Sequence, residues 1–140
     1  SYHHARRLWS LKYDKNLYFP DLFAFDKQMV ALAKQTQLFT WDKPELLHIH
    51  EDDKILAFNR SGLIFVFNFH PEHSFSDYLV YAPAGKYEVR LDTDERLFGG
   101  LGRLNPDQVH FTRPQGDAVE NRHALSLYLP CRCALVLSRV

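Results

Sequence analysis

The stretch LIFVFNF, from Leu63 to Phe69, is apolar at every position except Asn68. Turn residues bound it, because Ser61-Gly62 precedes it and Pro71 follows shortly after its end. A run that is apolar on both faces is typical of a strand at the centre of a sheet that is covered on two sides. Successive side chains of a strand point to opposite faces, so the three phenylalanines share one face and Asn68 lies on the other. The stretch therefore predicts a central β-strand whose ladder ends before Pro71.

Five other short runs in the last two thirds of the chain have the same strand-like composition. Clusters of Gly, Pro and Ser separate them, and such residues favour turns. Six strands at close spacing predict a mainly β protein with an antiparallel β-sandwich. In the run 86–92, Tyr87, Val89 and Leu91 alternate with charged residues, which predicts one buried face and one wet face that includes Asp92. The region 95–116 is predicted to be the longest loop, and the other strand-like runs cover residues 54–60, 77–81, 124–130 and 133–139.

The first third of the chain has a helical pattern instead. Apolar residues recur there at spacings of three and four, which predicts one apolar stripe on a helix. Asp21 stands where an N-cap is expected, and Lys34 near the far end agrees with that direction. An earlier helical turn or two is expected around ARRLWSL, and because about forty residues rarely build a core alone, the stripe must pack on the β part or on a second copy. The stripe consists of Leu22, Phe25, Met29 and Leu32.

The charge balance of the chain argues against two classes of partner. Lys+Arg and Asp+Glu each total 17, so no net charge attracts the phosphates of a nucleic acid or an anionic membrane surface. The apolar runs are far shorter than the roughly 20 residues that a membrane helix needs. We therefore predict a soluble chain with neither nucleic acid nor membrane as partner. Because it starts at Ser1 and its only methionine is Met29, we expect it to be part of a longer protein.

The two cysteines stand as CRC, at Cys131 and Cys133. Residues two apart on a strand point the same way, yet a disulfide between them would distort an extended backbone. We therefore predict two free, buried thiols, which fit a reducing compartment.

The sequence contains no specific signature of a metal, cofactor or catalytic site. Two histidine pairs, His48 with His50 and His70 with His73, lack the spacing of a closed metal site. DTDER lacks the glycine and closing glutamate of a calcium loop, and GGLGRLN lacks the third glycine of a dinucleotide fingerprint. No serine, cysteine or carboxylate set is selected either. We predict no metal, no cofactor and no catalytic residue, and we expect Asn68 and His70 to form hydrogen bonds at a turn.

Aromatic residues make up 14% of the chain, so packing alone need not explain all of them. An exposed ring with polar neighbours can stack on the apolar face of a sugar while those neighbours bind its hydroxyls. Four rings at predicted edges or loops are candidates for such contacts, and core packing is the alternative for each. They are Trp41, Tyr78, Tyr81 and Phe98.

Five segments carry a family resemblance in chain order: ARRLWSL, FDKQM, FNRSGLIFVFNFHPEHSFSDY, GKYEVRLDTDERLFGGLGRL and LSLYLPCRCALVL. Together they resemble the C-terminal end of 1,4-α-glucan (glycogen or starch) branching enzymes of the α-amylase superfamily. The resemblance implies that residues 1–40 are the helical tail end of a catalytic (β/α)₈ barrel and that residues 45–140 are a C-terminal all-β sandwich. The stripe Leu22, Phe25, Met29 and Leu32 would then pack on the barrel. Arg103, within FGGLGR, joins the four rings as a candidate glucan contact.

The same resemblance implies the function of the parent protein. Such enzymes are glycosyltransferases of glycogen and starch biosynthesis, which cleave an α-1,4 glucan through a covalent glycosyl-enzyme and transfer the piece to a 6-hydroxyl. Their catalytic carboxylates lie on barrel strands, so none is expected here and the chain should be inactive alone. We expect a cytoplasmic protein that supports the barrel, helps to hold glucan, and forms a homodimer through its exposed helical face when isolated. The alternatives are a free-standing carbohydrate-binding module and the C-terminal domain of a related amylase or debranching hydrolase.

Overall fold

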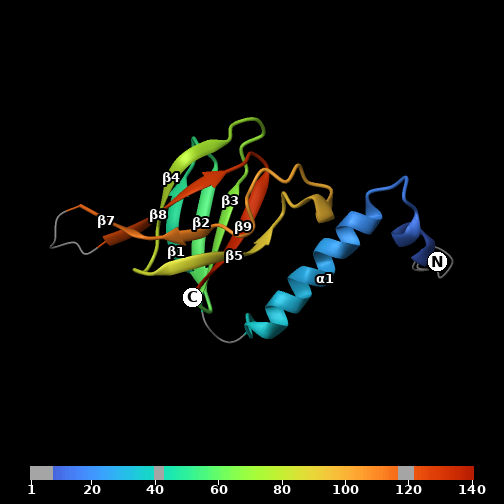
Figure 1. The fold of residues 1–140 in the computed structure, drawn as a ribbon, viewed down its shortest axis with the longest axis horizontal. Helices are drawn as coiled ribbons and strands as arrows, with labels where there is room; N and C mark the ends of the chain where they lie inside the picture. The colour runs from blue at the N-terminus through green and yellow to red at the C-terminus, as the bar shows by residue number, and fades with distance from the viewer. Residues whose placement is uncertain (1–7, 40–42, 117–121) are drawn as a thin grey trace.

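The computed structural model describes residues 8–39, 43–116 and 122–140. Two antiparallel β-sheets pack on each other, and one α-helix lies beside them (Figure 1). The larger sheet has six strands in the order β1-β2-β3-β9-β5-β6, and the smaller has three in the order β4-β8-β7. The strands are β1 (Glu45–His50), β2 (Ile55–Arg60), β3 (Leu63–Asn68), β4 (Phe75–Tyr81), β5 (Lys86–Asp92), β6 (Val109–Phe111), β7 (Arg113–Gln115), β8 (Arg122–Leu129) and β9 (Cys133–Arg139).

β3 lies inside the larger sheet, as its sequence predicts. It pairs antiparallel with β2 on one side and with β9 on the other. Ile64 and Val66 are each 1% exposed and face the smaller sheet. The three phenylalanines point to the opposite, outer face of the sheet, where Phe69 is 60% exposed. The prediction of a central strand is therefore confirmed, but its two faces are covered to different extents.

The main core fills the space between the two sheets and draws on both of them. Val80 of β4, Leu125 of β8 and Leu137 of β9 have no exposed surface. Burying an aliphatic side chain of this size stabilises a fold by roughly 1.5–3 kcal/mol. The predicted antiparallel β-sandwich is thus confirmed. The core consists of Ile55, Ala57, Ile64, Val66, Val80, Ala82, Tyr87, Leu125, Leu127, Leu129, Leu135 and Leu137.

The helix α1 (Phe19–Gln35) covers part of the outer face of the larger sheet. Its Leu32 is 8% exposed and forms a second cluster with Leu63, Leu91 and Val136. The helix begins before the predicted N-cap, since Tyr18 occupies that position without a side-chain hydrogen bond. Pro20 is tolerated in the first turn because that turn has no backbone partner for its missing N–H. Asp21 instead lies in the first turn, where its charge favours the positive end of the helix.

Among the described residues, two short 3-10 helices accompany α1. The helix η2 (Trp9–Tyr13) precedes α1 where an earlier helical turn is expected, and η3 (Arg96–Phe98) follows β5. Within residues 8–39, 43–116 and 122–140, no helix is long and apolar enough to cross a membrane.

β5 departs from the alternation that its sequence predicts. Val89 lies opposite Leu137, but Leu91 lies opposite Val136, so two steps along β5 match one step along β9. Such a β-bulge exchanges the faces of every residue beyond it. Leu91 therefore joins the cluster under α1, and Asp92 is only 4% exposed. The prediction that Asp92 lies on a wet face is wrong for this reason.

Three strands were not predicted. β1 has no strict alternation, because its register shifts between Leu46 and His48. β6 and β7 have three residues each and lie in the region expected to be one long loop. Segments this short carry no detectable periodicity, and their pairing with β5 and β8 defines them instead.

Candidate functional site

A row of stacked phenylalanines marks the outer face of the larger sheet. We call Phe58, Phe65, Phe67 and Phe69 the phenylalanine row. Ring centroids lie 4.9 Å apart for Phe58 and Phe65, 6.0 Å for Phe58 and Phe67, and 5.4 Å for Phe67 and Phe69. Phe67 is half-buried rather than part of the core. A strand covered on both sides would bury Phe67, but its face of the larger sheet is the outer one.

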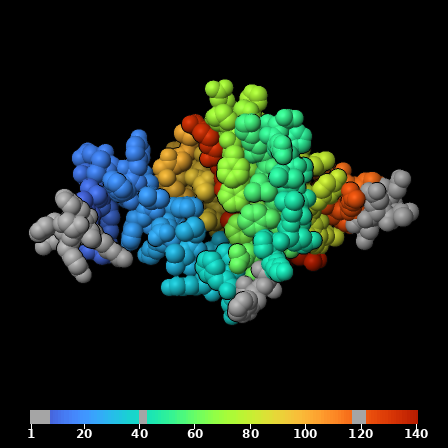
Figure 2. Space-filling view, turned by 180° about the vertical axis from the view of Figure 1, so that it is seen from behind, coloured from blue at the N-terminus to red at the C-terminus, as the bar shows by residue number. Residues whose placement is uncertain are grey.

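The apolar surface continues across β1. Leu46 lies opposite Phe58 and is 60% exposed, and Ile49 lies opposite Leu56 and is 59% exposed. In Figure 2 this side of β1 to β3 forms one broad surface, with α1 beside it. We call the phenylalanine row with Leu46 and Ile49 the outer apolar surface. Contiguous exposed apolar surface of this kind marks an interaction site far more often than scattered apolar residues do.

The predicted stripe of α1 is divided between two environments. Leu32 is buried on the sheet, and the Phe25 ring packs edge-on against Phe98 of η3 at 5.4 Å. Leu22 and Met29 stay exposed, at 60% and 43%. Met29 borders a largely apolar hollow between α1 and β3, of about 590 Å³. Its lining includes Met29, Val30, Ala33, Leu38, Phe39 and Phe65.

Tyr81 at the end of β4 is the most exposed of the predicted sugar-stacking rings that the structure describes. It is 39% exposed, and the guanidinium carbon of Arg122 lies 5.8 Å from its ring centroid. Tyr81 and Arg122 line a hollow of about 490 Å³ together with Glu45 and His123. The hollow thus combines an apolar ring with charged side chains at the open edge of the sandwich.

Tyr78 has a structural environment instead. Its hydroxyl donates to Asp53 Oδ2 at 2.9 Å and lies 3.1 Å from His48 Nε2. Burial and the hydrogen bond to Asp53 raise the pKa of Tyr78 to about 12. Burial and the nearby His50 lower the pKa of His48. These bonds tie the β1–β2 hairpin to the smaller sheet. Within the described parts of the chain, no three His, Cys, Asp or Glu residues are grouped to hold a metal ion.

The remaining candidate glucan-contact residues either contact other side chains of the protein or lie outside the described ranges. The Phe98 ring packs on Phe25, and the Arg103 guanidinium is bound to Asp94. Trp41 is outside the residues that the structure describes. Among the four candidates that the structure describes, Tyr81 is the exposed ring, and the other three contact different partners.

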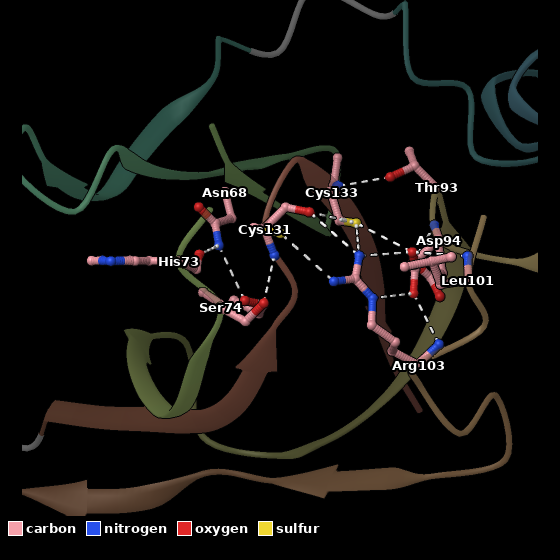
Figure 3. A network of polar contacts seen from close by, with 12 residues as sticks. Asn68, His73, Ser74, Thr93, Asp94, Leu101, Arg103, Cys131 and Cys133 are labelled. Carbon is pink, nitrogen blue, oxygen red and sulfur yellow. Dashed lines mark hydrogen bonds and ion pairs between the residues drawn. The ribbon is translucent and has the colours of Figure 1, made fainter. Parts of the chain in front are cut away.

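Asp94 organises the loop after β5 (Figure 3). It is 3% exposed, and its Oδ2 accepts hydrogen bonds from the Arg103 backbone N–H at 2.9 Å and from Arg103 Nε at 3.0 Å. Its Oδ1 accepts from Arg103 Nη2 at 2.9 Å and from the Leu101 N–H at 3.2 Å. Burial alone would raise the pKa of Asp94, but the bonds from Arg103 and Leu101 lower it to about 2. The loop is thus closed around one buried ion pair.

Asp92, the last residue of β5, is a second buried acid next to this loop. Its Oδ1 accepts the backbone N–H of Asp94 at 2.8 Å, and burial raises its pKa to about 6. The two acids could suggest a glycosidase pair, because such enzymes use one protonated and one ionised carboxyl group. In this chain, however, both oxygens of Asp94 accept hydrogen bonds from donors of the same loop.

The turn after β3 confirms the roles predicted for Asn68 and His70. Asn68 Nδ2 donates to the carbonyls of His73 and Leu129, and its Oδ1 accepts the His70 N–H. His70 Nδ1 in turn accepts the backbone N–H groups of Glu72 and His73. Both side chains therefore hold the chain reversal between the sheets.

Sequence reasoning missed the residues that complete these sites. Asp94 carried no signal as a buried acid, because its partner Arg103 is separated from it by a loop of irregular backbone. Leu46, Ile49 and Phe58 could have been found by assigning 45–50 as a strand and following the outer face across its pairing with β2.

Comparison with known proteins gives consistent similarities. Residues 47–140 match the family model "Alpha amylase, C-terminal all-beta domain". The chain is 42% identical over its whole length to a 1,4-alpha-glucan-branching enzyme of Dictyostelium discoideum, of which it covers 21%. It is 38% identical over 99% of its length to the enzyme of that name from Rhizophagus irregularis, covering 20% of that protein. A chloroplastic/amyloplastic 1,4-alpha-glucan-branching enzyme of Oryza sativa is 41% identical over 83% of the chain, which covers 14% of it. The chain thus spans about a fifth or less of these relatives.

Proposed function

Because the chain belongs to the family of alpha-amylase C-terminal all-beta domains, we propose that it is the C-terminal part of a 1,4-alpha-glucan-branching enzyme. In this proposal residues 45–140 form a sandwich domain without catalytic residues, and residues 1–40 belong to the end of the catalytic barrel. The parent enzyme would cleave α-1,4 glucan through a covalent glycosyl-enzyme and form α-1,6 branches. Its free Cys131 and Cys133 support a reducing compartment, and we propose the cytoplasm.

The outer apolar surface is the main support for the proposal that the sandwich supports the barrel. A sandwich that stood alone would expose Leu46, Ile49 and Phe69 to water at an unfavourable cost of roughly 25 cal/mol for each Å². The relatives are about five times as long as this chain, so most of such an enzyme lies outside it. We propose that the rest of the enzyme, namely the barrel, covers this surface together with the exposed Leu22 and Met29 of α1.

Two measurements on the 140-residue chain test whether it is non-catalytic. The chain should leave the iodine stain of amylose unchanged and form no α-1,6 linkages, because the branching carboxylates lie elsewhere in the proposal. Activity of the isolated chain would refute its assignment as non-catalytic.

Self-association of the isolated chain tests whether the outer apolar surface is an interface. With its surface uncovered, the isolated chain should dimerise in sedimentation experiments, and Phe69→Lys should weaken the dimer because it charges the outer apolar surface. Tyr128→Lys is the matched control, since Tyr128 is 37% exposed on the smaller sheet. A chain that stays monomeric at high concentration, or that responds equally to both substitutions, would contradict the proposal.

Glucan contact at Tyr81 is a second proposed role. The exposed ring, the Arg122 guanidinium and the carboxylate of Glu45 in one hollow support it, since sugars bind to a flat ring flanked by polar groups. Affinity electrophoresis through a gel that contains glycogen should retard the chain, and Tyr81→Ala should remove the retardation while Tyr128→Ala keeps it. Equal mobility with and without glycogen would reject this role.

A further inference from the structure

Two thiols gather around one guanidinium group. Cys131 Sγ lies 3.7 Å from Arg103 Nη1, and Cys133 Sγ lies 3.3 Å from Arg103 Nη2 (Figure 3). Cys133 Sγ also lies 3.2 Å from the carbonyl oxygen of Cys131 and 3.6 Å from Asp94 Oδ1. Neither thiol is in a disulfide. The two sulfur atoms therefore share one charged neighbour, although the proposed function uses neither.

The backbone between the two cysteines is a turn. Arg132 has a φ of +58°, and β9 begins only at Cys133. A disulfide between residues two apart is unfavourable on an extended strand, because side chains there stand parallel and the Cα atoms are far apart. The left-handed conformation of Arg132 replaces that extended geometry. The objection drawn from the sequence therefore does not apply to this pair.

The surroundings give the two thiols different reactivity. Hydrogen bonds with Arg103 and Ser74 lower the pKa of Cys131. Burial and the Asp94 carboxylate raise the pKa of Cys133 to about 11. The thiolate is the form that attacks an electrophile, so Cys131 is the better nucleophile and Cys133 stays protonated. The same division into an attacking and a resolving cysteine is found in redox-active thiol pairs.

We propose that Cys131 and Cys133 form an oxidation site at which a hydroperoxide converts Cys131 to a sulfenic acid that Cys133 then resolves to a disulfide. In the first step the Cys131 sulfur attacks a peroxide oxygen and the O–O bond breaks. The departing oxygen takes the proton of the Cys131 thiol, so that with hydrogen peroxide one water leaves. In the second step the Cys133 sulfur attacks the Cys131 sulfur, the S–O bond breaks, and the departing hydroxide takes the Cys133 proton to form a second water. Two thiols are oxidised and one peroxide is reduced. Cys131 is 9% exposed, so an oxidant that reaches its sulfur must be small.

The sequence allows a direct test, because trypsin cleaves after Arg132 and so separates the two cysteines. The reduced chain yields peptides 123–132 and 133–139, each with one cysteine. The chain is treated with limiting hydrogen peroxide, digested without reductant and measured by mass spectrometry. We expect the two peptides to be joined through a disulfide, in chains that remain monomers on a non-reducing gel and revert with dithiothreitol.

Single variants then separate the two roles. In Cys133→Ser, dimedone should trap a sulfenic acid on peptide 123–132. In Cys131→Ser, labelling of Cys133 should be at least about tenfold slower. If a variant does not fold, early dimedone trapping in the unaltered chain locates the first sulfenic acid. Labelling of Cys133 as fast as Cys131, or disulfides formed only between chains, would overturn the proposal. So would oxidation of both thiols no faster than that of free cysteine. This inference does not depend on the proposed enzymatic role.

Discussion

Replacing Arg103 by methionine should destabilise the chain strongly, because it removes the partner of a buried carboxylate. Asp94 is 3% exposed and the Arg103 side chain 27% exposed, with 2.9 Å between Arg103 Nη2 and Asp94 Oδ1. Breaking a buried ion pair by removing one partner typically costs 3–5 kcal/mol. Arg103 reaches partly into water, so we expect a loss of about 3 kcal/mol in the free energy of unfolding.

The pH dependence of this loss gives a second, more specific test. In the unaltered chain the pKa of Asp94 falls from 3.8 to about 2 on folding. A lowered pKa contributes stability that is present above the unfolded value and is lost as the pH falls toward 2, and a shift of this size corresponds to about 2 kcal/mol. In Arg103→Met the burial of Asp94 is no longer offset by the guanidinium, so its pKa should rise. The difference between the two chains should therefore be largest at neutral pH and shrink as the pH falls to 4.

Urea unfolding followed by circular dichroism measures both effects. Arg113→Met is the matched control, since Arg113 is exposed, and it should change the free energy of unfolding by less than about 0.5 kcal/mol. The double variant Asp94→Asn with Arg103→Met should recover part of the loss, because the unpaired charge is gone. A loss below about 1 kcal/mol for Arg103→Met, or a loss that does not change with pH, would refute the reasoning.

Three further predictions concern the sandwich. Asn68→Ala should cost about 2–3 kcal/mol in urea unfolding, since it leaves the buried acceptors of His73 and Leu129 unpaired; a cost near zero would show that water replaces the amide. Ultraviolet titration should find tyrosine ionisation near pH 12, and Tyr78→Phe should reduce it by one group, because burial and Asp53 raise the pKa of Tyr78 to about 12; an unchanged titration would contradict this. Burial lowers the pKa of both His48 and His110, so they contribute stability above about pH 6.5 that is lost as the pH falls further. His110→Gln should flatten this decline in thermal unfolding, and an equally steep decline would exclude His110 as its source.

The sequence by itself predicted the strand at 63–69, the sandwich class and the turn held by Asn68. Local rules are sufficient for these features, because each signal acts within a few positions. The signals are a run that is apolar on both strand faces, a proline at its end, and turn residues at regular spacing. The helical pattern around Leu32 was also visible, since its period spans several turns. The family resemblance came from the same ordered segments.

Tertiary structure alone decided which surface each side chain meets. A bulge between Val89 and Leu91 turned Asp92 from the expected wet face into the interior, and nothing in the alternating pattern records such a shift of register. Phe67 lies on the outer face of the sheet, outside the cluster that packs under α1, and the Arg103 guanidinium is bound to Asp94. The disulfide proposed between Cys131 and Cys133 likewise depends on the left-handed backbone of Arg132. These outcomes arise from contacts between residues distant in sequence, whose geometry no local periodicity encodes.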